Sequence, residues 1–312
     1  MNFRLPILAS LIFFAGLHTP ISPISADSDF SLPLYYGSDL AEQGFPSPLV
    51  HLKIGDHEAI FIVDTGAAVS TFAAWFAQDA GIEVRDSSAT VRGSTGDEMK
   101  IRTVSNISGM LGNQVPVRFN EAIVIDFPPI FKTSRLGGLL SPQMLTPAGR
   151  AAVLDLRAPT LLFKPFESAE AEVGLKDRGR PEELRVCVNH KSDFPNRLYA
   201  AEISVSGVKG TVLLDTGATR TLVSDKSRIG ELLRGRGLKG QQSQGVGGAP
   251  RDNRSVSGVK VDLAGQNLAL ASMTIGPVSS ECGPDGLLGM DALRSCVLIL
   301  GVSRAAIKCA VE

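Results

Sequence analysis

Two aspartates stand where an apolar run ends, and threonine and glycine follow each of them. They are Asp64 in the segment FIVDTGA (residues 61–67) and Asp215 in the segment VLLDTGA (residues 212–218), 151 positions apart. A lone buried carboxylate costs several kcal/mol unless it is paired or hydrogen-bonded. Two carboxyls held face to face share one proton, so that the ionised one can activate a water while the protonated one polarises a carbonyl. This chemistry needs neither a metal nor a covalent intermediate.

The residues beside each aspartate suit the same arrangement. Thr65 and Thr216 carry hydroxyls that can form hydrogen bonds between the two loops and lock them together. Gly66 and Gly217 have no side chain, so backbone amides can approach the carboxylates closely. We therefore expect these four residues to support the two aspartates.

The surroundings of the two segments repeat in the same order, which predicts two related halves. Each half begins with a hairpin-like alternation of apolar residues and continues, after Asp-Thr-Gly, with a stretch able to form a helix, residues 70–80 and 224–233. An apolar Gly-Leu-Leu run (138–140 and 286–288) then precedes a short helical turn and a closing hairpin. With 32 Gly, 18 Pro and 6% aromatic residues, the composition favours turns and short strands, so we expect a mainly β protein.

The doubled hydrophobic-hydrophobic-Asp-Thr-Gly-Ala motif resembles the retropepsin-like and pepsin-like aspartic peptidases. Alanine follows both Asp-Thr-Gly tripeptides, at Ala67 and Ala218, so the chain is more similar to a tandem, single-chain retropepsin-like protein of the bacterial exported aspartyl protease type than to pepsin. The resemblance implies a bilobal acid-protease fold, in which two pseudo-twofold-related β-barrel-like lobes enclose the active cleft. Pepsin-like loops commonly place a hydroxyl residue where these alanines stand. Without that side-chain donor, we expect higher pKa values for the acid pair and an activity maximum at mildly acidic to near-neutral pH.

The resemblance also implies β-hairpin flaps that close over a peptide. Two Gly-rich segments at matching places in the halves would form the flap tips: Gly93, Ser94, Thr95 and Gly96 in the first half, and Gly245, Val246, Gly247 and Gly248 in the second. The first flap lacks the tyrosine of pepsin-like enzymes. The hydrophobic-hydrophobic-Gly element of the family is intact at Gly289, whereas the first half has Ser141 there, and we expect this serine to cap the helical turn that follows it.

The beginning of the chain predicts export. Arg4 precedes an apolar run from Leu5 to Leu17, and a polar stretch then ends in Ile-Ser-Ala, so we expect a signal peptide over residues 1–26, cleaved after Ala26. The apolar run is well short of the roughly 20 residues that span a bilayer, so we expect no stable membrane anchor after the signal is removed. The expected localisation is therefore periplasmic or secreted.

The remaining chain divides into four parts. Residues 27–46 form a short polar lead-in, residues 47–166 the N-terminal lobe, and residues 195–312 the C-terminal lobe. Between the lobes, residues 167–194 are rich in charge, and we expect them to form an exposed linker.

Four cysteines, an even number, fit an oxidising compartment. The closing hairpin turns around residues 301–303, and Cys296 and Cys309 are equidistant from that turn, which places them opposite each other on two strands. We predict a disulfide between them, which leaves Cys187 to pair with Cys282 by elimination. The alternative is four buried free thiols.

Composition and missing motifs exclude several other functions. The 31 basic and 32 acidic residues nearly cancel, which argues against a nucleic-acid-binding surface. His51, His57 and His190 show no metal-ligand spacing, and no phosphate-loop, dinucleotide or Gly-x-Ser-x-Gly motif is present, so we expect no metal and no cofactor.

The sequence therefore predicts an aspartic-type endopeptidase that acts on polypeptide substrates. Since both aspartates belong to one chain, we expect a monomer to suffice for activity. The alternative is a catalytically silent peptide-binding or scaffold protein with the same fold.

Overall fold

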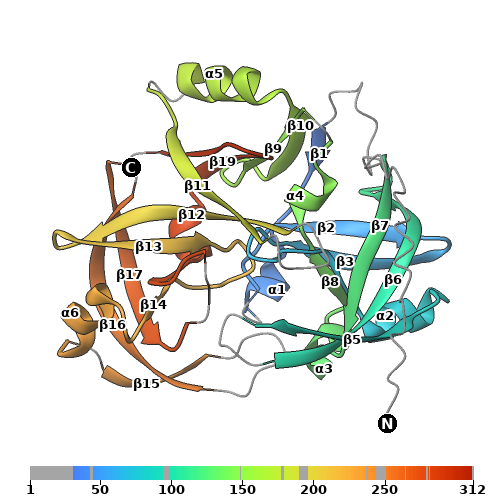
Figure 1. Ribbon diagram of the computed structural model, residues 1–312, viewed down its shortest axis with the longest axis horizontal. Helices are drawn as coiled ribbons and strands as arrows, with labels where there is room; N and C mark the ends of the chain where they lie inside the picture. Colours follow the sequence, from blue (N-terminus) through green and yellow to red (C-terminus); the bar gives the residue numbers. More distant parts are fainter. Residues whose placement is uncertain are drawn as a thin grey trace, which may run out of the picture.

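The computed structural model describes residues 31–42, 45–93, 98–147, 149–176, 179–189, 196–236, 238–243, 251–263, 265–278, 280 and 282–310. The predicted signal peptide lies outside these residues, and so do residues 94–96 and 245–248 of the predicted flap tips. The described chain is mainly β and has two lobes, as the sequence predicted (Figure 1).

The two lobes contain the same kinds of elements in the same order, except that helix α3 has no counterpart among the described residues of the C-terminal lobe. The N-terminal lobe consists of β2 (Leu49–Ile54), β3 (His57–Val63), β4 (Thr71–Ala73), α2 (Ala74–Asp79), β5 (Arg85–Arg92), β6 (Glu98–Leu111), β7 (Val115–Ile125), α3 (Pro129–Thr133), β8 (Leu136–Leu140) and α4 (Pro142–Leu145). The C-terminal lobe consists of β12 (Asn196–Val205), β13 (Val208–Leu214), β14 (Leu222–Ser224), α6 (Arg228–Arg234), β15 (Leu238–Ser243), β16 (Arg251–Leu263), β17 (Gln266–Gly276), β18 (Gly286–Leu288) and α7 (Met290–Leu293). The other elements are β1 (Ser31–Pro33), α1 (Ser38–Glu42), β9 (Ala151–Asp155), β10 (Thr160–Lys164), α5 (Phe166–Lys176), β11 (Glu182–Asn189), β19 (Cys296–Gly301) and β20 (Ala305–Cys309).

One strand order occurs in both lobes. In the N-terminal lobe β2 and β3 form a hairpin, β8 runs parallel to β3, and β4, β7, β6 and β5 follow in turn. The C-terminal lobe repeats this order with β12, β13, β18, β14, β17, β16 and β15. The two first hairpins turn at Gly55 and Gly207, whose φ angles of 57° and 82° are accessible to glycine without a steric penalty.

The closing hairpins of the two halves join the lobes through a symmetric strand pair. β9 and β19 run antiparallel, with Leu154 opposite Leu298 at the centre. On either side Val153 is opposite Ile299 and Asp155 is opposite Val297, so each half contributes the same positions in reverse order. This register is what a twofold axis through the sheet requires. The strand pair therefore fixes the lobes about the axis that the repeated sequence predicted.

The segment between the lobes is more than the exposed linker that the sequence predicted. Residues 166–176 form helix α5, which lies at the top of Figure 1 over the strands β9, β19 and β20, here called the joining sheet. Strand β11 pairs with both β12 and β20. Phe166, Ala169 and Val173 are buried against β9, β19 and β20. These three residues are spaced as one face of a helix. The charged residues of α5 lie on its opposite, exposed face. The sequence prediction considered only the high charge of the segment and therefore missed the apolar face of the helix.

Both predicted disulfides are present. Cys296 and Cys309 are register partners in the hairpin of β19 and β20 and are bonded to each other. Cys187 on β11 is bonded to Cys282, which connects the segment between the lobes to the C-terminal lobe. The alternative of four free thiols is therefore wrong.

Candidate active site

The two aspartates occupy equivalent joints in the two sheets. Asp64 follows the last residue of β3, and its backbone N–H donates to the carbonyl oxygen of Leu140 on β8 at 2.9 Å. Asp215 follows β13 in the same way and donates to Leu288 on β18 at 3.0 Å. The parallel strand pairs thus hold both backbones rigidly. Asp64 is 7% and Asp215 9% exposed, so both residues are buried.

The two threonines connect the loops as the sequence predicted. The backbone N–H of Thr65 donates to Oγ1 of Thr216 at 3.0 Å, and the N–H of Thr216 donates to Oγ1 of Thr65 at 3.1 Å. Each hydroxyl in turn donates across the lobe boundary, that of Thr65 to the carbonyl of Leu214 at 2.9 Å and that of Thr216 to the carbonyl of Val63 at 2.7 Å. Both threonines are fully buried. Four hydrogen bonds related by the twofold axis therefore fix the distance between the loops.

The two glycines bring each loop against the carboxyl of the other. A Cβ atom on Gly66 would lie 2.6 Å from Cγ of Asp215, and one on Gly217 would lie 2.6 Å from Cγ of Asp64. No side chain fits at either position. The carboxyls of Asp64 and Asp215 lie within hydrogen-bonding contact of each other.

Backbone amides hold one oxygen of each carboxyl. Oδ1 of Asp64 accepts from the N–H groups of Gly66 at 2.8 Å and Ala67 at 3.2 Å. Oδ1 of Asp215 accepts from Gly217 at 3.0 Å and Ala218 at 2.9 Å. The alanines, which have no side-chain donor, therefore contribute through their backbones.

The pKa values of both aspartates are raised above the ordinary value. For Asp64, burial is the main cause, and the backbone hydrogen bond from Gly66 opposes it. The pKa of Asp215 is raised further, by burial and then by the negative charge of Asp64 beside it. The two carboxyls titrate as one unit that holds a proton well above the pH at which an exposed aspartate loses it.

A comparison of the chain with protein families identifies its family. The model of a family described as aspartyl protease matches the chain twice, over residues 50–140 and 201–292. The chain belongs to the aspartyl protease family. Each match contains one Asp-Thr-Gly loop together with the strands that hold it, so the family assignment covers both halves of the site. No curated protein matches the chain.

Four further residues of this aspartyl protease family member hold the two Asp-Thr-Gly loops, and the sequence interpretation missed them. The hydroxyl of Ser70 accepts from the N–H of Ser141 at 3.1 Å, and the hydroxyl of Thr221 accepts from the N–H of Gly289 at 3.3 Å. Asp291 accepts from both the N–H and the hydroxyl of Thr221 at 2.8 Å. These contacts fix the turn that follows β8 or β18 to the strand that follows each loop. Aligning the halves position by position would have paired Ser70 with Thr221, both hydroxyl residues, and so pointed to these two.

The fourth residue, Gln143, stands where the second half has Asp291. Its buried side-chain amide donates to the carbonyl oxygens of Thr65 at 3.2 Å, Ala67 at 2.9 Å and Arg197 at 3.1 Å. Hydrogen bonds thereby connect the first Asp-Thr-Gly loop to α4 and to β12, the first strand of the other lobe.

The prediction for Ser141 is wrong in one respect. It stands at the N-cap position of α4, but its hydroxyl caps no backbone amide and has no hydrogen-bond partner among the described residues. In the second half a Cβ on Gly289 would lie 2.5 Å from the carbonyl carbon of Arg220, so glycine is required there. The backbone differs between the two sites, with ψ at 106° for Ser141 and −174° for Gly289, and the first half accepts a side chain.

The remaining predictions for the site concern the flaps. Arg92 ends β5 and Glu98 begins β6, so the two strands lead to and from the first flap segment, of which only Gly93 is described. Residues Ser94, Thr95 and Gly96, and the whole second segment from Gly245 to Gly248, lie outside the described residues.

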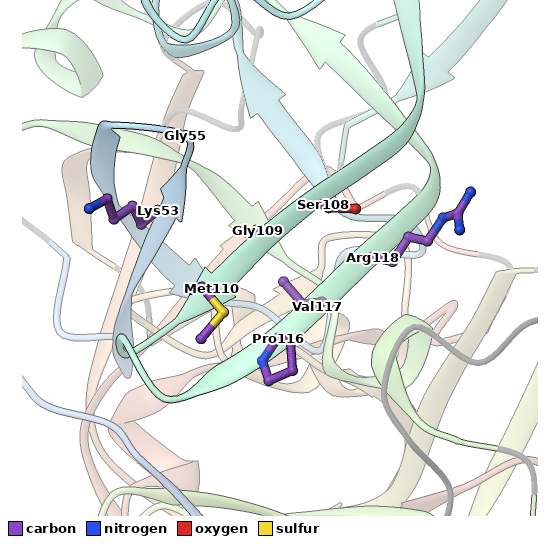
Figure 2. A pocket seen from close by; sticks show the side chains of 8 residues that line it. All are labelled: Lys53, Gly55, Ser108, Gly109, Met110, Pro116, Val117 and Arg118. Carbon is purple, nitrogen blue, oxygen red and sulfur yellow. The ribbon is translucent and has the colours of Figure 1, made fainter.

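One surface hollow lies away from the two aspartates. It measures about 620 Å³ and lies between the turn of the first hairpin and the strands β6 and β7, with Lys53, Ser108 and Arg118 along its sides (Figure 2). It contains none of the residues predicted to do chemistry. Within the described residues, no group of three His, Cys, Asp or Glu side chains is placed to hold a metal ion. No helix in the described part of the chain is long and apolar enough to cross a membrane.

Proposed function

We propose that this chain is an aspartic endopeptidase in which Asp64 and Asp215 activate the attacking water. The observation that carries the proposal is the pairing of two buried carboxyls, each held through Oδ1 by its own loop and covered by the glycine of the other. This leaves the second oxygen of each carboxyl to bind a water and a peptide. The raised pKa values favour a proton shared by the pair above the pH at which an exposed aspartate loses its proton.

The reaction follows from that shared proton. The ionised carboxyl accepts a proton from the bound water as its oxygen bonds to the peptide carbonyl carbon, and the protonated carboxyl donates to the carbonyl oxygen. A tetrahedral diol results. The first carboxyl then passes its new proton to the amide nitrogen, and the C–N bond breaks while the diol returns a proton to the other carboxyl. Both products leave with the pair in its starting protonation state.

The protein is proposed to act as an exported monomer on polypeptides. Two disulfides fit an oxidising compartment outside the cytoplasm. The hydrogen bonds between Thr65 and Thr216 are formed within one chain, so a second copy is not needed to complete the site. In this proposal residues 1–26 serve as the export signal and the flap segments cover the bound peptide.

A catalytically silent peptide-binding protein is the alternative function. A binder has no need for a second buried acid, and keeping two of them raises the free energy of the folded state. The intact dyad therefore favours the enzyme.

The experiment that tests the proposal measures cleavage of casein and of a mixed peptide library, with and without a statine inhibitor. We expect cleavage between pH 5 and 7 that the inhibitor abolishes and that Asp64→Asn or Asp215→Asn removes. Asp56→Asn is the matched control, because Asp56 is an exposed carboxyl in the turn of the first hairpin. Peptide binding without cleavage by the unaltered protein would support the silent binder instead.

A further inference from the structure

The two disulfides differ in how far a reagent can reach them. Cys296 and Cys309 are 0% and 1% exposed, so the bond between them is closed to solvent. In the other disulfide Cys282 is 3% exposed, but Cys187 on β11 is only partly buried. Thiol–disulfide exchange requires a thiolate to reach one of the two sulfurs. Cys187 is therefore the cysteine at which a reductant can attack this protein.

The Cys187–Cys282 disulfide belongs to a small hydrophobic cluster beside the second Asp-Thr-Gly loop. We call it the disulfide cluster; its members are Cys187, Leu198, Ala200, Leu213, Ala218, Leu222, Val278, Cys282 and Leu287. Ala218 is part of the loop, and its N–H donates to Oδ1 of Asp215 at 2.9 Å. Leu213 stands two residues before Asp215 on the chain. The disulfide is thus packed together with residues that hold this aspartate in place.

The chain that follows Cys282 lies directly on β13, the strand that leads into the same loop. A Cβ atom on Gly283 would lie 2.1 Å from the backbone nitrogen of Leu213, so the two backbones are in contact. Two residues later, the N–H of Asp285 donates to the carbonyl oxygen of Thr211 at 3.1 Å, and Oδ2 of Asp285 accepts from the N–H of Thr211 at 2.8 Å. Cys282 is therefore fixed against β13, and the disulfide ties the paired strands β11 and β12 to it.

The N-terminal lobe has an equivalent cluster that needs no disulfide. Beside the first Asp-Thr-Gly loop, Ile62, Leu139 and Ala67 occupy the matching places. Their cluster includes the stacked rings of Phe127 and Phe131, whose centroids are 4.1 Å apart. The N-terminal lobe contains no cysteine. Of the two clusters, only the one beside the second loop depends on a bond that a reductant can break.

Reduction forces the two sulfurs of Cys187 and Cys282 apart. Bonded sulfurs are about 2 Å apart, whereas non-bonded heavy atoms need about 3.5 Å or more. The disulfide cluster must therefore open by about 1.5 Å at this point. Because Cys282 is held on β13, the opening separates β11 from the strand that leads to Asp215. A displacement of about 1 Å in an active site can lower the rate about a hundredfold.

We propose that the Cys187–Cys282 disulfide is a thiol-exchange site through which a dithiol reductant switches off the second half of the acid pair. The effect on cleavage rests on the proposed peptidase function. A thiolate of the reductant attacks Sγ of Cys187, the S–S bond breaks, and Cys282 leaves as a thiolate that takes up a proton. The second thiol of the reductant then displaces Cys187 and closes the reductant's own disulfide. The reductant loses two electrons, and the protein gains two electrons and two protons.

Graded treatment of the folded protein with dithiothreitol, followed by iodoacetamide and peptide mapping, tests this site. We expect Cys187 and Cys282 to be alkylated at dithiothreitol concentrations that leave Cys296 and Cys309 unlabelled. The kcat/KM for peptide cleavage should fall about tenfold or more in step with this labelling and return when the protein is reoxidised. Labelling of all four cysteines together, or full activity after selective reduction, would overturn the proposal.

Two double variants separate the exchange site from a general loss of stability. Cys187→Ala with Cys282→Ala should have the activity of the reduced protein and give no further response to dithiothreitol. Cys296→Ala with Cys309→Ala is the matched control, since it removes the enclosed disulfide and should still lose activity about tenfold on reduction. Full activity of the first double variant would refute the role of the bond. If that variant does not fold, the reversible reduction of the unaltered protein decides the question.

Hydrogen exchange tests the site without relying on peptidase activity. Selective reduction should speed the exchange of backbone amides in residues 213–218, while residues 62–67 of the other loop change less. If no peptide is cleaved but this difference is found, the exchange site stands and the peptidase function fails. If peptides are cleaved and neither the amides nor the cleavage rate respond to reduction, the exchange site alone is refuted.

Discussion

Replacement of Thr65 by valine would remove one hydroxyl from the lobe boundary and leave the side-chain shape nearly unchanged. That hydroxyl accepts from the N–H of Thr216 at 3.1 Å and donates to the carbonyl of Leu214 at 2.9 Å. Both partners lie at a fully buried position, so no water takes the place of the hydroxyl. A buried donor or acceptor left without a partner costs about 1–3 kcal/mol, so the two together should lower the free energy of unfolding by about 2–6 kcal/mol.

Urea unfolding with the disulfides intact measures this loss, and Thr65→Ser is the matched control. Serine keeps the hydroxyl and loses one methyl group, which should cost about 1 kcal/mol. Peptidase activity should fall more steeply in the valine variant than in the serine variant, because the loops move apart when the hydrogen bonds are lost. Thr216→Val should behave like Thr65→Val, since its hydroxyl makes the symmetric pair of bonds at 2.7 and 3.0 Å. If valine and serine at position 65 were equally stable, the hydrogen bonds would not be what holds the lobes.

Three other perturbations give distinct signatures. Asp215→Asn should abolish cleavage, yet stabilise the protein at pH 7. Because the pKa of Asp215 is raised in the folded state, that state binds more protons than the unfolded state from about pH 4 up to the folded pKa, and the stability of the unaltered protein falls over this range. The free energy of unfolding, measured at several pH values, should therefore depend less on pH in the variant. Gly217→Ala should destroy activity because its Cβ would lie 2.6 Å from the opposite carboxyl, whereas Gly235→Ala, with no atom within 4 Å, should leave kcat/KM unchanged. Replacing Cys296 and Cys309 together by alanine opens a loop of 13 residues and should lower stability by about 3 kcal/mol; a melting temperature equal to that of the unaltered protein would contradict this.

Much of the site could be predicted from the sequence because the residues that form it occur in both halves of the chain. A carboxylate at the end of an apolar strand is costly alone, and finding it at matched places in two halves leaves pairing as the simple solution. Thr65 and Gly66 could be assigned for the same reason, since Thr216 and Gly217 repeat them. The disulfide of the last hairpin was predictable because a hairpin fixes which residues lie opposite each other.

Other features were hidden because the two halves differ there. Gln143 and Asp291 occupy equivalent positions with different chemistry, so no motif marks either. Helix α5 was missed since its buried face has only three residues among many charges, and only the joining sheet gives that face something to cover.

The symmetric register of β9 and β19 has a consequence for how such a site can change. In an assembly of two identical chains, an interface of this kind makes every substitution appear on both sides of the axis at once. Here the two sides of the axis are formed by different residues of one chain, and α5 and β11 connect them. Leu154 and Leu298 keep the halves in register while residues away from the axis vary independently. A residue in one half can therefore change while its counterpart in the other half stays the same, and the strand pair that joins the halves is not altered.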